Sequence, residues 1–148
     1  MASAGYSGTP LVQKLGIKEM HRVAVLGAPH GFALGVLPAG TRLQHTLAGK
    51  ALDVLVVFVT RRSDLVARIA TCRQRMQPAA GLWIAWPKRA SGMATDITED
   101  TIREVALPTG LVDNKVCAID DTWSGLRLVI RKELREGTRT TPPGTRDR

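Results

Sequence analysis

Leu52-Asp-Val-Leu-Val-Val-Phe-Val-Thr60 is the stretch of this chain that decides its fold. Two further runs have the same apolar character, namely Arg22-Val-Ala-Val-Leu-Gly27 and Gly81-Leu-Trp-Ile-Ala-Trp-Pro87. A strand with one face in water alternates polar and apolar residues, whereas a strand covered on both faces can be apolar throughout. The three runs therefore predict buried parallel strands.

Helix signals lie between and around these strands. A short helix is expected after Pro10, a second after Ser63, and a third at Thr98, where two acidic residues follow a good cap. Residues 41–47 predict an edge strand, and residues 111–119 and 126–131 predict a terminal hairpin.

This order of elements predicts a three-layer α/β/α sandwich with a mostly parallel sheet of about six strands. Right-handed crossovers place the strands in the order 2-1-3-4-6-5, with the sixth antiparallel. The arrangement resembles a shortened methyltransferase variant of the Rossmann fold. Residues 1–20 are expected to form a turn and short helix packed on the domain, residues 21–134 the Rossmann-like domain, and residues 135–148 a disordered basic tail.

The chain carries a large positive charge for its 148 residues, with a formal net charge of +8. Such a charge attracts phosphates, nucleic acid or acidic proteins without choosing among them. No apolar stretch approaches the roughly 20 residues of a membrane span, and the N-terminus lacks a secretory signal. We expect a cytoplasmic protein without membrane contact, in which Cys72 and Cys117 are reduced core residues and no metal site is present.

Cationic side chains follow two neighbouring strands of the predicted sheet. Arg61 and Arg62 end one strand, and Lys88, Arg89 and Ser91 follow the next. Because ligands gather beyond the carboxyl ends of parallel strands, we expect these residues to form an anion-binding edge. The alternative is that the cations pair with nearby carboxylates, for which the candidates are Asp96, Glu99, Asp100 and Asp120.

Two further candidates come from neighbouring turns. Trp123, in the hairpin turn, is expected either to contact a ligand or to cap the core. His30 is a weak candidate for acid–base catalysis because its ordinary pKa is near neutrality, but no carboxylate partner can be assigned.

The turn from Gly27 to Gly31 lies where a dinucleotide or S-adenosylmethionine site would place its glycine-rich loop. Its glycine spacing departs from G-x-G-x-x-G, Pro29 removes a backbone donor, and residues 43–51 hold no carboxylate for a ribose. No cofactor is therefore implied, although Gly27, His30 and Gly31 stay candidate ligand-binding residues.

Several blocks of this sequence together resemble a small bacterial family, catalogued as a domain of unknown function, number 3052. The blocks are Gly5-Tyr-Ser-Gly-Thr-Pro10, Lys14-Leu-Gly-Ile17, Trp86-Pro-Lys-Arg-Ala-Ser-Gly92, Asp96 with Thr98-Glu-Asp100, and Thr122-Trp-Ser-Gly-Leu126. The resemblance runs from about Gly5 to Lys132. It implies a cytoplasmic bacterial protein and brings no activity or cofactor to these positions.

We expect a non-catalytic binding or regulatory module for an anionic ligand or an acidic partner. One alternative is a small enzyme that uses S-adenosylmethionine or a nucleotide through Gly27 to Gly31. Another is nonspecific nucleic-acid binding through the arginine-rich residues 61–75 and the basic tail. The protein is expected to be a monomer or a homodimer paired through the edge of its terminal hairpin.

Overall fold

The structure, a computed structural model, describes residues 9–139 and contains one six-stranded sheet. The strands are β1 (Arg22–Leu26), β2 (Arg42–Gln44), β3 (Leu52–Phe58), β4 (Met76–Pro87), β5 (Leu111–Ala118) and β6 (Trp123–Ile130). Their order is β2-β1-β3-β4-β6-β5; β1 to β4 are parallel, and β6 is antiparallel to both β4 and β5. The predicted fold class and strand order are confirmed.

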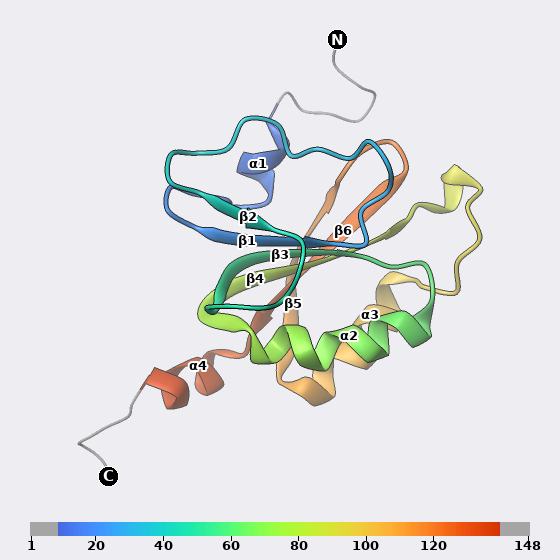
Figure 1. Ribbon diagram of the computed structural model, residues 1–148. Coiled ribbons are helices and arrows are strands. Elements are labelled where there is room, and N and C mark those ends of the chain that lie inside the picture. The colour runs from blue at the N-terminus through green and yellow to red at the C-terminus, as the bar shows by residue number, and fades with distance from the viewer. Residues whose placement is uncertain (1–8, 140–148) are drawn as a thin grey trace.

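The layers on the two sides of the sheet are unequal. The helices are α1 (Leu11–Lys14), α2 (Arg62–Gln74), α3 (Glu99–Ala106) and α4 (Lys132–Arg139), with single 3-10 turns at η1 (Arg89–Ser91) and η2 (Leu107–Thr109). The longer helices α2 and α3 cover one face, whereas the four-residue α1 and the segment after β1 cover the other (Figure 1). We call these the α2 face and the α1 face.

The core consists of two clusters, one on each face of the sheet. Along β3, Leu55 and Val57 pack with the α2 face, while Val56 and Phe58 pack with the α1 face. Every one of these residues is buried. The apolar run that begins at Leu52 thus has the predicted cause, because successive side chains enter opposite core layers.

Some element ends differ from the predicted ones. The edge strand shortens to β2, and β4 begins at Met76, since its first residue pairs with Leu52 before the register shifts to Val54 opposite Gly81. Pro78 fits this irregular stretch, because proline lacks the N–H that a regular ladder needs. The helical backbone of α4 enters the segment expected to be disordered, and residues 140–148 of that segment lie outside the described residues.

Of the two cysteines expected in the core, Cys72 is fully buried and Cys117 is half-buried. Cys72 is fully buried on α2, and burial raises the pKa of its thiol to about 11. Cys117 is half-buried against the α1-face cluster, and burial likewise raises its pKa. Neither thiol is activated as a nucleophile. None of the helices within residues 9–139 has the length and apolar character that a membrane crossing needs.

One buried hydrogen bond fastens the thin layer to the sheet. The indole N–H of Trp83, a fully buried residue of β4, donates to the carbonyl of Leu15 at 3.0 Å. Val12, Leu15 and Ile17 pack in the same cluster. Because Leu15 is buried, its carbonyl would be left without a hydrogen-bond donor if this bond were lost, and an unsatisfied buried acceptor lowers the stability of the fold.

Trp83→Phe is expected to lower the free energy of unfolding by about 1–3 kcal/mol more than Trp86→Phe does. Both variants lose similar apolar area, but within residues 9–139 only Trp83 gives its indole N–H to a backbone carbonyl. Urea unfolding followed by circular dichroism measures both losses. Equal losses would contradict the role given to the hydrogen bond.

Candidate functional site

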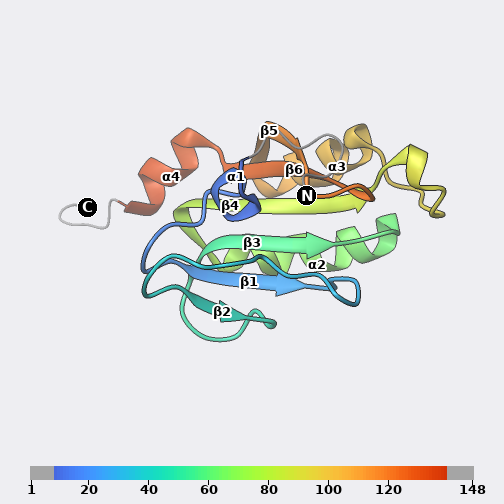
Figure 2. The ribbon, with the colours of Figure 1, turned by 90° about the horizontal axis from the view of Figure 1, so that it is seen from above.

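The loops that the sequence singled out lie along one edge of the sheet, where β1, β3 and β4 end (Figure 2). We call this edge the carboxyl rim. The start of β6 joins it, because Pro87 pairs with Trp123 and the Lys88 N–H donates to the Thr122 carbonyl at 2.7 Å. The predicted meeting of these loops is therefore present in the fold.

The turn that begins at Gly27 is packed against the neighbouring strand. Gly27 has a φ of +69°, and a Cβ there would lie 2.9 Å from the carbonyl oxygen of Phe58. Phe32, further along the turn, packs edge-on against Phe58 with ring centroids 4.9 Å apart. The glycine thus serves a close backbone approach. His30 is exposed and makes no hydrogen bond through its ring within residues 9–139.

Trp123 lies in the core beneath the rim. It is only 6% exposed, and its ring meets Phe58 edge-on at a centroid distance of 5.0 Å. Of the two roles considered for Trp123, the structure places its ring in the packing role. Ser91 is also used internally, since its hydroxyl donates to the Lys88 carbonyl at 2.7 Å and accepts from the Met93 N–H at 3.2 Å.

Asp96 holds the start of α2 from a distance. The helix begins at Arg62, and its N-cap residue Arg61 provides no capping side chain; Ser63, after which the sequence predicts this helix, already lies inside it. The Arg62 N–H instead donates to Asp96 Oδ1 at 2.7 Å. A carboxylate in this position satisfies an otherwise unpaired donor and faces the positive end of the helix dipole.

The acidic residues of α3 are paired with Arg103 on the same helix. Arg103 forms ion pairs with Glu99, with Asp100 at 2.9 Å and with Asp113 of β5 at 3.1 Å. Hydrogen bonds to Asp113 and then Glu99 raise the pKa of this guanidinium above its ordinary value. The cluster ties α3 to β5. No other ion pair is found within residues 9–139, so none involves a rim cation.

The rim cations have no carboxylate partners in the described part of the chain. Arg61, Arg62 and Arg89 are exposed and Lys88 is half-buried, and none of their side chains makes an ion pair or hydrogen bond there. The fourth candidate carboxylate, Asp120, accepts the backbone N–H groups of Thr122 and Trp123 at 2.8 Å each. The expected alternative, in which the cations pair with these four carboxylates, is not the arrangement observed.

Two hollows lie along the rim, one on each side of residues 94–95. One, of about 640 Å³, is lined by Arg61, Ser63 and Asp96, and the other, of about 540 Å³, by Arg89, Thr98 and Glu99 among others. The two carboxylates are those already engaged by the Arg62 N–H and by Arg103. Arg62, Lys88, Gly27, His30 and Gly31 line neither. The structure therefore brings Arg61 and Arg89 to adjacent hollows and leaves the other candidates outside them.

Residues 93–98 contribute to the walls of these hollows, and none of them was among the predicted ligand-binding residues. Thr95 is the most informative, because its hydroxyl donates to the Thr60 carbonyl at 2.6 Å and so links this wall to the end of β3. The run of small and polar residues after Gly92 is the only local signal of a surface loop.

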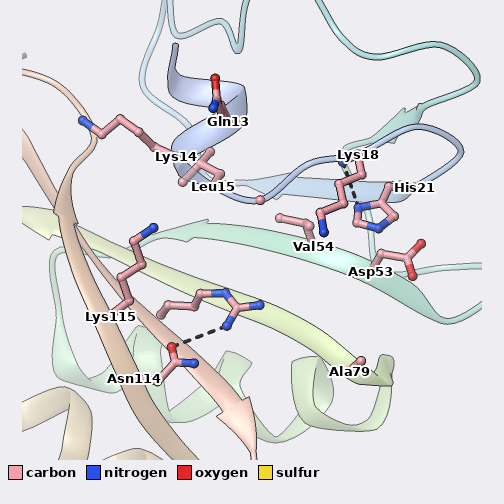
Figure 3. A pocket seen from close by; sticks show the side chains of 12 residues that line it. Gln13, Lys14, Leu15, Lys18, His21, Asp53, Val54, Ala79, Asn114 and Lys115 are labelled. Atoms are coloured by element: carbon pink, nitrogen blue, oxygen red, sulfur yellow. Dashed lines mark hydrogen bonds between the residues drawn. The ribbon is translucent and has the colours of Figure 1, made fainter. Parts of the chain in front are cut away.

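A third hollow, of about 450 Å³, lies on the α1 face toward the opposite edge of the sheet (Figure 3). We call it the amino-edge pocket. Its lining is drawn from both sides of the space beneath α1: Gln13, Lys14, Leu15, Gly16, Lys18, His21, Asp53, Val54, Ala79, Asn114, Lys115 and Arg127. Sequence reasoning missed it because these residues come from distant segments. Within residues 9–139 no group of three His, Cys, Asp or Glu side chains that could hold a metal ion occurs.

Comparison with known proteins identifies a family and a fold. The family described as "Protein of unknown function (DUF3052)" matches residues 38–132, more than half of the chain. No curated protein matches.

Solved structures of similar fold include several methyltransferases. A SAM dependent methyltransferase from Aquifex aeolicus is 13% identical with a TM-score of 0.58, and the match covers 81% of this chain and 87% of that one. Magnesium protoporphyrin IX methyltransferase (ChlM) from Synechocystis PCC 6803 is 13% identical with a TM-score of 0.56, covering 80% and 74%. Aeropyrum pernix fibrillarin is 14% identical with a TM-score of 0.54, covering 84% and 70%. At these identities the likeness concerns the fold alone.

Asp96→Ala is expected to lower the free energy of unfolding by about 1–2 kcal/mol, because the first N–H of α2 loses its acceptor. Asp64→Ala is the matched control, since it removes a carboxylate from the first turn of the same helix without removing that bond, and it should cost about 0.5 kcal/mol. Thermal unfolding compares the two. A control loss as large as that of Asp96→Ala would assign the effect to charge alone.

Proposed function

We propose that this chain, which belongs to the DUF3052 family, is a cytoplasmic, non-catalytic binding module that holds an anionic ligand or an acidic partner at its carboxyl rim. One observation carries the proposal. Four cations gather at the rim while the carboxylates that would neutralise them bind backbone N–H groups or Arg103.

Arg61 and Arg89 are the residues best placed to contact an anion. Each lines one of the two adjacent hollows, and a guanidinium can donate two parallel hydrogen bonds to a carboxylate or a phosphate. Arg62 and Lys88 lie beside them in sequence and add to the local positive potential. Because the two arginines are exposed and lie in separate adjacent hollows, the rim suits an extended acidic segment better than an enclosed substrate.

Nucleic-acid binding is less well supported by the arginine-rich residues 61–75. Arg73 donates to the Thr109 carbonyl at 3.2 Å, and Arg75 donates to the Leu47 carbonyl at 2.9 Å. These two side chains are therefore engaged in holding α2 to its neighbours, and only part of the arginine run is free to meet a phosphate backbone.

Replacing Arg61 and Arg89 together by alanine is expected to weaken binding of a fluorescein-labelled oligoglutamate peptide about tenfold at low salt. The matched control replaces Arg42 and Arg68, two other exposed arginines, and removes the same charge. Fluorescence anisotropy measures both affinities, and thermal unfolding checks that both variants fold. Equal weakening in the two variants would mean that net charge alone attracts the peptide.

A small enzyme that uses S-adenosylmethionine is the second candidate, favoured by the likeness in fold to methyltransferases. The turn after β1 argues against it, because Gly27 lies close to the Phe58 carbonyl oxygen and Phe32 packs edge-on against the Phe58 ring. We therefore expect no binding heat when S-adenosylmethionine is titrated to millimolar concentration in a calorimeter. Saturable binding that Gly31→Val abolishes would favour the enzyme instead.

A further inference from the structure

The amino-edge pocket collects cationic side chains from both of its walls. Figure 3 shows Lys18, which follows α1, and Lys115, from β5, extending their amino groups into the space between α1 and the sheet. Arg127 of β6 lines the same space. The pocket exists because α1 has only four residues and leaves this part of the α1 face without a helix above it.

Arg127 is the least expected of these side chains, since it stands in the middle of a strand. Its neighbours Leu126 and Leu128 enter the α2-face core, so alternation directs Arg127 to the α1 face. There it lies over Gly81 of β4, whose added Cβ would come within 2.5 Å of the Arg127 Nε. Gly81 therefore provides the room that the guanidinium occupies.

The guanidinium of Arg127 is poorly satisfied where it lies. It is half-buried, and within residues 9–139 its only hydrogen bond runs from Nη1 to the Asn114 amide oxygen at 3.4 Å, the long end of the normal range. Burial lowers its pKa from the ordinary value, and repulsion by nearby Arg135 lowers it further. Most of the N–H donors of this guanidinium are therefore left to bind an anion in the pocket.

The charges around the pocket are not balanced by the protein itself. Lys18 and Lys115 make no hydrogen bond or ion pair through their side chains within the described residues. Asp53 is the one carboxylate in the lining, and its Oδ2 accepts the Arg22 N–H at 2.8 Å. The amino group of Lys14, which also lines the pocket, donates to the Ala118 carbonyl at 2.8 Å.

We propose that the amino-edge pocket binds a phosphate-bearing small molecule, with Arg127, Lys18 and Lys115 contacting the phosphate. Three cations suit a doubly charged phosphate monoester better than a single carboxylate, and a guanidinium matches two phosphate oxygens at once. The volume of about 450 Å³ falls in the usual range of small-molecule sites and exceeds what one ion fills. Gln13, His21 and Asp53 can meet hydroxyl groups of the rest of the molecule.

This site is separate from the carboxyl rim. The rim lies beyond the ends of β1, β3 and β4, whereas the pocket is lined by Asp53 and Val54 at the start of β3 and by Ala79 in the first part of β4. Neither site shares a lining residue with the other. The two proposals can therefore fail independently.

Titration calorimetry of the full chain with ribose 5-phosphate at low salt tests the proposal. Arg127→Met is expected to weaken binding about tenfold or more, because it removes the guanidinium and keeps an apolar stem of similar length. Arg131→Met, at an exposed arginine just after β6, and the paired Arg61 and Arg89 variant of the rim should change the affinity less than about twofold. Ribose, which lacks the phosphate, should not bind. Equal affinity of the Arg127→Met variant and the wild type would overturn the proposal.

Thermal unfolding separates a binding role for Arg127 from a structural one. In phosphate-free buffer Arg127→Met should melt at the same temperature as the wild type or higher, and only the wild type should gain stability when ribose 5-phosphate is added. Gly81→Ala should also weaken binding while the protein stays folded, because the new methyl group displaces only the flexible end of Arg127. A large loss of melting temperature in Arg127→Met, without any loss of affinity, would show a purely structural residue.

Discussion

The hydrogen bond from the Trp83 indole to the Leu15 carbonyl is the constraint on which the α1 face depends. A helix of four residues has no stability of its own, because helix formation repays its cost only over several turns. Here the sheet stabilises the helix, since the buried indole N–H of β4 and an apolar layer hold α1 in place. The position of α1 in turn fixes one wall of the amino-edge pocket and leaves the Gly27–Leu37 segment to cover the rest of that face.

Fold class and strand order could be predicted because they follow from local patterns and few topological choices. The apolar runs around Val56 and Ile84 identify buried strands, and right-handed crossovers leave little freedom in arranging them. Element ends were harder, because they depend on tertiary contacts. The start of α2 is capped by Asp96, which is 34 residues away from Arg62, and no local pattern reveals such a partner.

The candidate site was predictable only in part, for the same reason. Parallel strands bring Arg61 and Arg89 to one edge, which sequence order alone implies. Trp123 differs, because strand alternation turns its ring into the core beside Phe58. The amino-edge pocket was missed altogether: a charged residue between Leu126 and Leu128 is visible in the sequence, but nothing there links it to Lys18, which is more than 100 residues earlier in the chain.

The close approach of Gly81 to Arg127 makes these two positions one steric unit shared by neighbouring antiparallel strands. A side chain at position 81 and a long side chain at position 127 compete for the same volume above the sheet. Substitutions there are therefore epistatic: a larger residue at 81 displaces the guanidinium while arginine occupies 127, and it meets no such contact once residue 127 is shortened. The position of the Arg127 guanidinium on β6 thus depends on glycine at position 81 of β4.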